Sequence, residues 1–285
     1  MAMKLDTCFL CGSSEAEVIH HGVRDTSDID VLKCGGCGLV RLSETIENAD
    51  VFYQESGMRG GRTSPLNELR RETWDDDERR FRFTEKMIEG KSVLDFGCGD
   101  GGYLLRAKTI ARDVCGVELE SSVREALQKE GIPCYEAIRE AGTMDVITMF
   151  HVLEHIDDPV PLLREIAGHL SAGGQLIVEV PNADDALLSL YGCDAFADFT
   201  YWKCHIYLYT MDTLRRLAKK ANLWIRFMKQ IQRYPLCNHM YWLAKGKPGG
   251  HFAWSFLDDK ELSEKYGSQL AKLGIADTIL CGLSQ

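Results

Sequence analysis

The segment that most constrains the fold of this chain is a short apolar stretch that leads into a run of glycines and then into a helical pattern. The apolar stretch covers residues 93–96 and is interrupted by Asp95, and the run is Gly97-Cys98-Gly99-Asp100-Gly101-Gly102. Glycine best tolerates the positive φ angles of a sharp strand-to-helix turn. Further along, short buried strands and helices alternate: strands are predicted over 92–96, 113–118, 132–135, 145–150 and 175–180, and helices over 102–109, 121–130 and 159–170. This alternation predicts a parallel sheet with helices on both faces.

The glycine run fits two cofactor-binding motifs. Its spacing matches the G-x-G-x-x-G of dinucleotide-binding proteins, and together with Asp95 it matches the D-x-G-x-G-x-G of S-adenosylmethionine (SAM) enzymes. A dinucleotide would place its dianionic pyrophosphate on this loop, where the Asp95 carboxylate would repel it. SAM carries a cationic ammonium and sulfonium, which Asp95 would attract. Asp95 therefore favours SAM, with a ligand-free tight turn as a third interpretation, and Glu118 could accept the ribose hydroxyls of either cofactor.

On these residues the chain resembles the class I SAM-dependent methyltransferases. The resemblance is carried by residues 93–102, 116–118, 145–159 and 170–182 and covers about 91–230. It implies a Rossmann-like α/β fold with a seven-stranded sheet whose last strand is antiparallel, a methyltransferase domain over 91–285, and an insertion at about 231–258. It also implies a cofactor site formed by Asp95, Gly97, Cys98, Gly99, Glu118, Leu119 and Phe150.

Four of the eleven cysteines form two C-x-x-C-G knuckles, Cys8/Cys11 and Cys34/Cys37. The glycine after each second cysteine lets the backbone amides turn toward the thiolates, and four thiolates complete a tetrahedral zinc site without an open position. The odd number of cysteines and the length of the chain speak against a disulfide scaffold. We therefore expect a structural Zn²⁺ in a zinc-binding module over residues 1–45, with free buried thiols as the alternative.

A zinc module followed by a tyrosine-containing bridge and a class I core resembles a bacterial group of sugar and polysaccharide-pathway methyltransferases. Residues 34–41, the Phe52-Tyr53 pair and residues 205–210 carry this narrower resemblance. It implies a helical bridge or lid over 46–90, in which Tyr53 covers the cofactor or packs, and a sugar or nucleotide-linked sugar as acceptor in glycan biosynthesis. Ribosomal-RNA methyltransferases also carry such knuckles, but a basic module would be expected of them. Here residues 1–45 hold seven Asp and Glu against four Lys and Arg.

Methyl transfer to a hydroxyl requires a group that removes its proton. Histidine, with an ordinary pKa of about 6.5, suits that role near neutral pH. The candidates are His151 and His155 after the fourth predicted strand and His205 after the fifth. His151-Val-Leu-Glu-His155 also matches the H-x-x-E-H of inverted zinc peptidases, but that motif needs a helix, and here it directly follows a strand. A hydrogen-bonded loop histidine at 151, or an aromatic core around His205, is the structural alternative.

The acceptor is expected near the end of the sixth strand. The sequence predicts a helix over 211–221 capped by Thr210, that sixth strand over 223–230 and a seventh over 277–283. The candidate substrate-binding residues are Tyr207, Arg233, Tyr234 and His239. Residues 211–250 carry nine Lys and Arg against one Asp, which favours a phosphate-bearing acceptor, although a solvated helix face would explain most of these cations.

The charge and hydropathy of the whole chain limit its partners. A formal charge of −10 argues against a nucleic-acid partner. No apolar run reaches the roughly 18 residues of a membrane span, and no secretory signal is evident, so a cytoplasmic methyltransferase for a small acceptor is expected. An RNA methyltransferase and a non-catalytic SAM-binding scaffold are the alternative functions, and the sequence leaves the oligomeric state open.

Overall fold

A seven-stranded sheet forms the centre of the protein. The computed structural model describes residues 5–45, 54 and 66–285, so the Phe52-Tyr53 pair lies outside the described residues. The strand order is β10-β11-β8-β7-β4-β5-β6. These strands are β4 (Ser92–Phe96), β5 (Asp113–Val117), β6 (Cys134–Tyr135), β7 (Met144–Phe150), β8 (Leu170–Pro181), β10 (Trp224–Ile231) and β11 (Thr278–Ser284). All seven predicted strands are present.

One strand runs against the others. Strands β4 to β8 pair in parallel with one another, whereas β11 pairs antiparallel with both β8 and β10. The predicted Rossmann-like α/β fold with an antiparallel last strand is confirmed. Because of this reversal, Thr278 at the start of β11 pairs with Pro181 and Ile231 at the ends of β8 and β10. The first residues of β11 therefore reach the carboxyl edge of the sheet.

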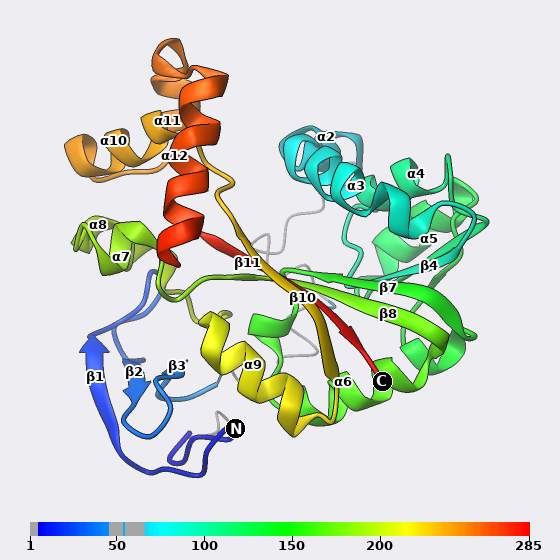
Figure 1. Cartoon of the computed structure of the whole chain (residues 1–285), viewed down its shortest axis with the longest axis horizontal. Coiled ribbons are helices and arrows are strands. Elements are labelled where there is room, and N and C mark those ends of the chain that lie inside the picture. The colour runs from blue at the N-terminus through cyan, green and yellow to red at the C-terminus, as the bar shows by residue number, and fades with distance from the viewer. Residues whose placement is uncertain (1–4, 46–53, 55–65) are drawn as a thin grey trace.

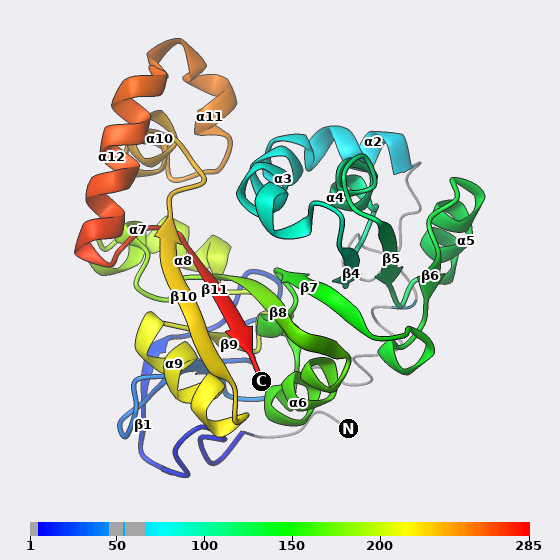
Figure 2. The ribbon, with the colours of Figure 1, turned by 45° about the vertical axis from the view of Figure 1, so that its right-hand side comes forward.

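Helices cover both faces of the sheet (Figures 1 and 2). Helices α3 (Trp74–Ile88), α4 (Gly102–Ala107) and α5 (Ser121–Lys129) lie on one side, with α2 (Leu66–Glu72) leading into α3, and α6 (Pro159–Gly168) and α9 (Met211–Lys220) lie on the other. Alternate residues of β8 pack on opposite faces of the sheet. Ile177 lies in the core beneath α3, α4 and α5, whereas Leu176 and Val178 lie in the core beneath α6 and α9. Thr210 caps α9 as predicted, because its side chain accepts from the Thr213 amide.

The N-terminal residues form a second, smaller sheet that ends on the main fold. Strands β1 (Ala16–His20), β2 (Val31–Cys34) and β3 (Val40–Leu42) pair antiparallel in chain order, and β9 (Tyr207–Leu208) adds beside β3. Cys8, Cys34 and Leu39 are buried in the same apolar core as residues of α6 and α9. The N-terminal sheet thus shares backbone hydrogen bonds and a core with the larger fold.

Between β10 and β11 the chain leaves the sheet as a helical arm. The arm consists of α10 (Leu236–Lys245), α11 (Gly250–Ala253), the 3-10 turn η4 (Ser255–Leu257) and α12 (Lys260–Leu273). It stands beyond the sheet edge beside the short helices α7 (Ala186–Ser189) and α8 (Asp194–Thr200) (Figures 1 and 2). The arm extends past the segment 231–258 expected from the sequence. Helix α12 gives a weak sequence signal because only Gly267 and Leu270 are buried in it.

A glycine in the middle of β11 makes room for an aromatic contact between the sheet and α3. A Cβ atom on Gly282 would lie 2.6 Å from Cδ1 of Phe227, because the Phe227 ring of β10 lies across the glycine. Phe227 packs edge-on against Phe83 of α3, with 5.6 Å between ring centroids. A strand glycine at such a position marks a close approach of a neighbouring group.

We expect Gly282→Ala to lower the free energy of unfolding by about 1–3 kcal/mol, the usual cost of overpacking a core, because the new methyl group displaces the Phe227 ring. Gly168→Ala at the end of α6 is the matched control, since a Cβ there meets nothing within 4 Å. Urea unfolding followed by circular dichroism measures both variants. A wild-type midpoint for Gly282→Ala would mean that the ring moves without cost.

Candidate active site

The glycine run makes a sharp turn at the carboxyl end of β4. Gly97, Gly99 and Gly101 have φ angles of 73°, 50° and 72°, a region that favours glycine. The amides of Gly97 and Cys98 both donate to the Val117 carbonyl of β5, at 2.8 and 3.0 Å. The loop is therefore fixed to two neighbouring strands and leads directly into α4.

The carboxyl groups of Asp77, Asp95 and Asp100 lie close together at this loop. Asp95 is buried at the end of β4, and its burial raises its pKa to about 7. Asp77 of α3 is also buried, and burial together with the charge of Asp100 raises its pKa to about 6. These shifts persist although Arg80 and Arg106 act to lower the pKa of Asp77. Carboxyl groups that crowd one another favour a cationic ligand, so the loop fits the ammonium and sulfonium of SAM better than a pyrophosphate.

The carboxylate of Glu118 stands beside the loop, just after β5. Its Oε2 accepts from the Gly99 amide and its Oε1 from the Glu120 amide, both at 3.0 Å. These bonds hold the carboxylate at the carboxyl edge, where the spacing predicted a ribose ligand. The side chain of Cys98, in contrast, is buried, with its Sγ 3.7 Å from Sγ of Cys134. The thiol of Cys98 therefore belongs to the core, and only the backbone of Cys98 remains as an expected contact with the cofactor.

The other expected cofactor contacts lie at the same edge. Phe150 ends β7, and its ring packs edge-on against Tyr103 at 5.0 Å between centroids. Leu119 follows Glu118 and is half-buried, with its carbonyl accepting from Arg124 at 2.6 Å. Tyr53, the remaining expected contact, lies outside the described residues.

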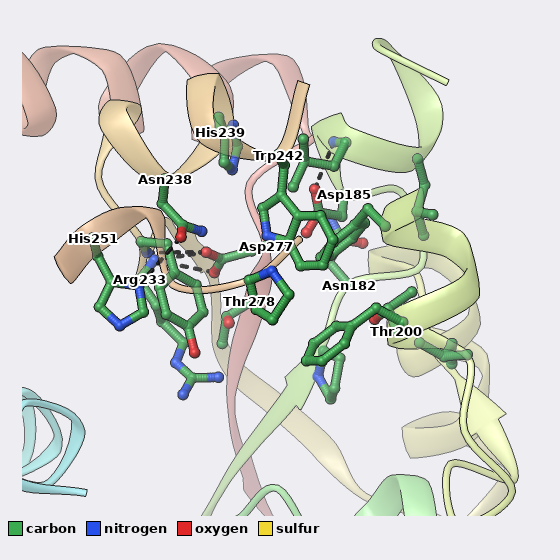
Figure 3. A pocket seen from close by; sticks show the side chains of 18 of the residues that line it. Asn182, Asp185, Thr200, Arg233, Asn238, His239, Trp242, His251, Asp277 and Thr278 are labelled. Carbon is green, nitrogen blue, oxygen red and sulfur yellow. Dashed lines mark hydrogen bonds between the residues drawn. The ribbon is translucent and has the colours of Figure 1, made fainter. Parts of the chain in front are cut away.

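A cavity of about 270 Å³ opens at the carboxyl edge beneath the helical arm (Figure 3). Its walls come from the residues after β7 and β8, the start of β11, and helices α8 and α10. Five of the seven candidate catalytic and substrate-binding residues line it: His151, His205, Arg233, Tyr234 and His239. Much of the remaining wall is apolar or aromatic, including Leu187, Phe196, Phe199 and Trp242.

His151 directly follows β7 in a left-handed backbone conformation with φ 55°. Its Nδ1 lies 3.0 Å from Oε1 of Glu154, and its Nε2 lies 3.1 Å from a guanidinium nitrogen of Arg233. Because an ionised carboxylate only accepts, the Nδ1–H donates to Glu154, while Nε2 faces both Arg233 and, at 3.3 Å, Oε1 of Glu179. Burial and Arg233 act to lower the pKa of His151, but Glu154 and Glu179 outweigh them and the net shift is upward. This is the arrangement of a base that is oriented by a carboxylate.

Glu179 of β8 is a buried carboxylate that sequence reasoning missed. It is completely buried and accepts hydrogen bonds of 2.8 and 3.0 Å from Arg79 and of 2.9 Å from Arg80. Although burial acts to raise it, the pKa of Glu179 is held well below its usual range by these arginines and His151. The available sequence signal was a charged residue inside the apolar strand 176–180.

Arg233 is held between α3 and the cavity. Its guanidinium pairs with Asp76 of α3 and also donates to His151. Its backbone amide donates to the carboxylate of Asp277 at 2.9 Å. The charge of Arg233 is therefore already matched by a carboxylate of the protein.

The other predicted histidines differ from His151 in their protonation. Burial lowers the pKa of His205 to about 3 and that of His239 to about 4. Burial also lowers the pKa of His155, which lies outside the cavity lining, with its Nδ1 2.7 Å from the Cys204 carbonyl. Among the histidines that line the cavity, His151 alone has a raised pKa.

Tyr207 also lies outside the cavity lining. It is buried in the core beside β3, and its hydroxyl donates to the Asp157 carbonyl at 3.1 Å. Its ring packs edge-on against Phe9, with 4.7 Å between centroids. The structure therefore gives Tyr207 a packing environment.

The four knuckle cysteines form a second candidate site, in the N-terminal sheet. Sγ of Cys8 lies 3.6 Å from Sγ of Cys37, and Sγ of Cys11 lies 3.5 Å from Sγ of Cys34. All four sulfur atoms lie within 4.8 Å of one another. Zn–S bonds of about 2.3 Å in a tetrahedron separate the sulfurs by roughly 3.8 Å, so the four thiols fit zinc with little movement.

Comparison with known proteins identifies the family. The model of the family described as "Methyltransferase domain" matches residues 66–226, more than half of the chain. The chain belongs to this family and is a class I SAM-dependent methyltransferase. No helix among the described residues is long and apolar enough to cross a membrane.

Individual relatives agree with this assignment. A protein named ubiquinone biosynthesis O-methyltransferase from Cupriavidus pinatubonensis is 25% identical over 174 residues, which cover 55% of this chain and 70% of the relative. The mitochondrial protein of that name from Candida albicans is 34% identical over 128 residues, or 38% of each chain. The crystal structure of a SAM-dependent methyltransferase from Archaeoglobus fulgidus shares the fold, with a TM-score of 0.50, 19% identity and coverage of 75% of this chain and 94% of that chain.

Glu118→Ala is expected to raise the dissociation constant of SAM at least tenfold, about 1.4 kcal/mol. The variant would lose the charge-assisted hydrogen bonds expected between Glu118 and the ribose, and it also leaves the Gly99 amide without its partner. Isothermal titration calorimetry measures the effect, with Glu125→Ala on the exposed face of α5 as control. An unchanged dissociation constant in Glu118→Ala would mean that the ribose is held by other residues.

Proposed function

We propose that the protein transfers the methyl group to a hydroxyl of a small ring-shaped acceptor bound in the cavity beside His151. One observation carries this proposal. His151 lines the cavity, while its Nδ1 is held by the buried carboxylate of Glu154. A hydroxyl acceptor needs a base at this position, because its proton must leave as the new C–O bond forms.

Each part of the site has a task in this reaction. SAM supplies a methyl group on a sulfonium. The carboxyl groups of Asp95 and Asp77 and that of Glu118 hold and orient the cofactor at the glycine loop. His151 takes the proton of the acceptor hydroxyl at Nε2, and Glu154 stabilises the resulting imidazolium. The hydroxyl replaces Arg233 as the partner of Nε2, and Arg233 retains its ion pair with Asp76.

The lining of the cavity favours an aromatic hydroxyl as acceptor. Two polar side chains in the wall are engaged by the protein itself: Asn182 donates to the carbonyl of Ala276 at 2.7 Å, and Asp277 accepts from the amides of Arg233 and Tyr234. The faces left for a ligand are therefore largely apolar. The names of the relatives, O-methyltransferases of ubiquinone biosynthesis, also support transfer to oxygen.

A sugar or nucleotide-linked sugar, expected from the sequence, is the second candidate acceptor. The ring of Tyr234 lines the cavity and is 38% exposed, so a sugar ring could pack on it. The pairing of Arg233 with Asp76 weakens the argument for a phosphate. A panel of phenols, catechols, free sugars and nucleotide sugars, assayed for methylated product, separates the two candidates. Turnover confined to the sugars would overturn the aromatic proposal.

His151→Asn is expected to lower kcat at least 100-fold, a typical contribution of a general base, with SAM affinity unchanged. Asparagine suits the test because it tolerates the left-handed backbone at this position. His21→Asn, at a histidine whose side chain is 85% exposed, is the matched control. Steady-state kinetics with the best acceptor and calorimetry with SAM provide the two measurements. Wild-type kcat in His151→Asn would assign the base to another group.

We further propose that Cys8, Cys11, Cys34 and Cys37 hold a structural zinc ion in a module formed by residues 1–45. The near-tetrahedral spacing of the four sulfurs supports this. The ion would connect the two knuckles of this small sheet. Its role is structural because four thiolates leave no coordination position open.

Cys34→Ser is expected to reduce the zinc content by one equivalent and to lower the melting temperature, while SAM affinity remains close to wild type. The physical reason is the loss of a metal cross-link between the two knuckles. Cys193→Ser, at a cysteine outside the cluster, is the control. Metal analysis by mass spectrometry and thermal unfolding test the prediction, and equal zinc in wild type and Cys34→Ser would contradict it.

A further inference from the structure

A second group of metal-ligating side chains lies behind the wall of the cavity. Glu154 and His155 belong to the 3-10 turn η3 (Leu153–His155), and His205 comes from the segment before β9. One ligand atom of each residue lies within 4.8 Å of the others. The rings of His155 and His205 are 5.0 Å apart between centroids. Residues 50 positions apart in the chain thus converge on one point.

Two buried polar atoms of this group have no hydrogen-bond partner among the described residues. They are Oε2 of Glu154 and Nδ1 of His205. Glu154 is completely buried, and its other oxygen already accepts from His151. A buried polar atom without a partner costs about 1–3 kcal/mol, more for a charged group, and such atoms are rare in native proteins. Both atoms belong to residues of the same close group, so one shared partner would satisfy both.

The chemistry of the three side chains identifies the class of that partner. A carboxylate oxygen and two imidazoles match the ligand preference of divalent transition metals, whereas Mg²⁺ and Ca²⁺ prefer oxygen ligands throughout. The Nδ1–H of His155 donates to the Cys204 carbonyl. Metal-ligating histidines are commonly oriented by such a bond to a backbone carbonyl.

We propose that Glu154, His155 and His205 bind a divalent transition-metal ion at the wall of the acceptor cavity. Three protein ligands leave at least one coordination position for water or an oxygen of the acceptor. His205 both lines the cavity and belongs to the metal group, and Glu154 connects the ion to His151. This site is separate from the four cysteines, and its existence does not depend on the proposed acceptor.

Metal content of the purified full-length chain tests the site directly. After loading with Zn²⁺ and removal of free metal, wild type is expected to hold one equivalent more than Glu154→Gln and one more than His205→Asn. His239→Asn is the matched control, because it also replaces a buried histidine of the cavity wall and should retain the wild-type content. The comparison remains valid whether or not the cysteines hold zinc. An equal metal content in wild type, Glu154→Gln and His205→Asn would overturn the proposal.

A second measurement uses proteins in which Glu154, His155 and His205 are all intact. It covers the case in which Glu154→Gln and His205→Asn fail to fold. Co²⁺ bound by nitrogen and oxygen gives weak visible bands, whereas thiolate ligands add intense charge-transfer bands. Titration of Cys34→Ser and wild type with Co²⁺ is expected to give one equivalent of the nitrogen-oxygen type in each. A titration that shows thiolate-bound cobalt alone in wild type, and none of the nitrogen-oxygen type in Cys34→Ser, would overturn the site. Neither readout uses methyl transfer, so a failure of the proposed function would not affect them.

Discussion

The buried charge of Glu179 constrains the whole site. A carboxylate inside a central strand costs several kcal/mol unless cations and hydrogen bonds compensate it. Arg79 and Arg80 of α3 supply that compensation, and Nε2 of His151 lies 3.3 Å from Oε1 of Glu179. Helix α3 must therefore lie over the carboxyl edge of the sheet, and its position follows from charge as well as from apolar packing.

The same helix serves both halves of the site. Asp77 reaches the glycine loop, where the cofactor is expected, and Asp76 pairs with Arg233 beside the acceptor cavity. Thr84 hydrogen-bonds Tyr103 of α4 at 3.0 Å, which ties α3 to the helix that follows the loop. A displacement of α3 would therefore disturb both binding regions together. The pairing of β10 with β11, and the Phe227–Phe83 contact, fix the far end of this arrangement.

The reversal of β11 explains why the acceptor cavity has the walls it has. Asp277 and Thr278 can line the cavity because an antiparallel strand begins where its neighbours end. The helical arm between β10 and β11 leaves and re-enters the sheet at this edge, and so brings Trp242 over the cavity (Figure 3). In an all-parallel sheet the start of this strand would lie at the opposite edge, and the arm could not close the site in this way.

The sequence by itself determined the features that depend on short spacings. The strand–helix alternation, the positive φ angles of the glycine loop, the place of Glu118 after β5 and the two cysteine knuckles each follow from residues close together in the chain, where backbone sterics and side-chain periodicity act locally. Only the tertiary structure decided which side chains share a site. Glu179 and Arg79 are 100 positions apart, and no local pattern reports that a carboxylate in a strand will meet an arginine of a distant helix. His155 and Tyr207 were candidate site residues on the same kind of sequence argument as His151 and Tyr234, yet they lie outside the cavity lining. The sequence could not separate them, because burial and charge pairing are set by the packing of the whole chain.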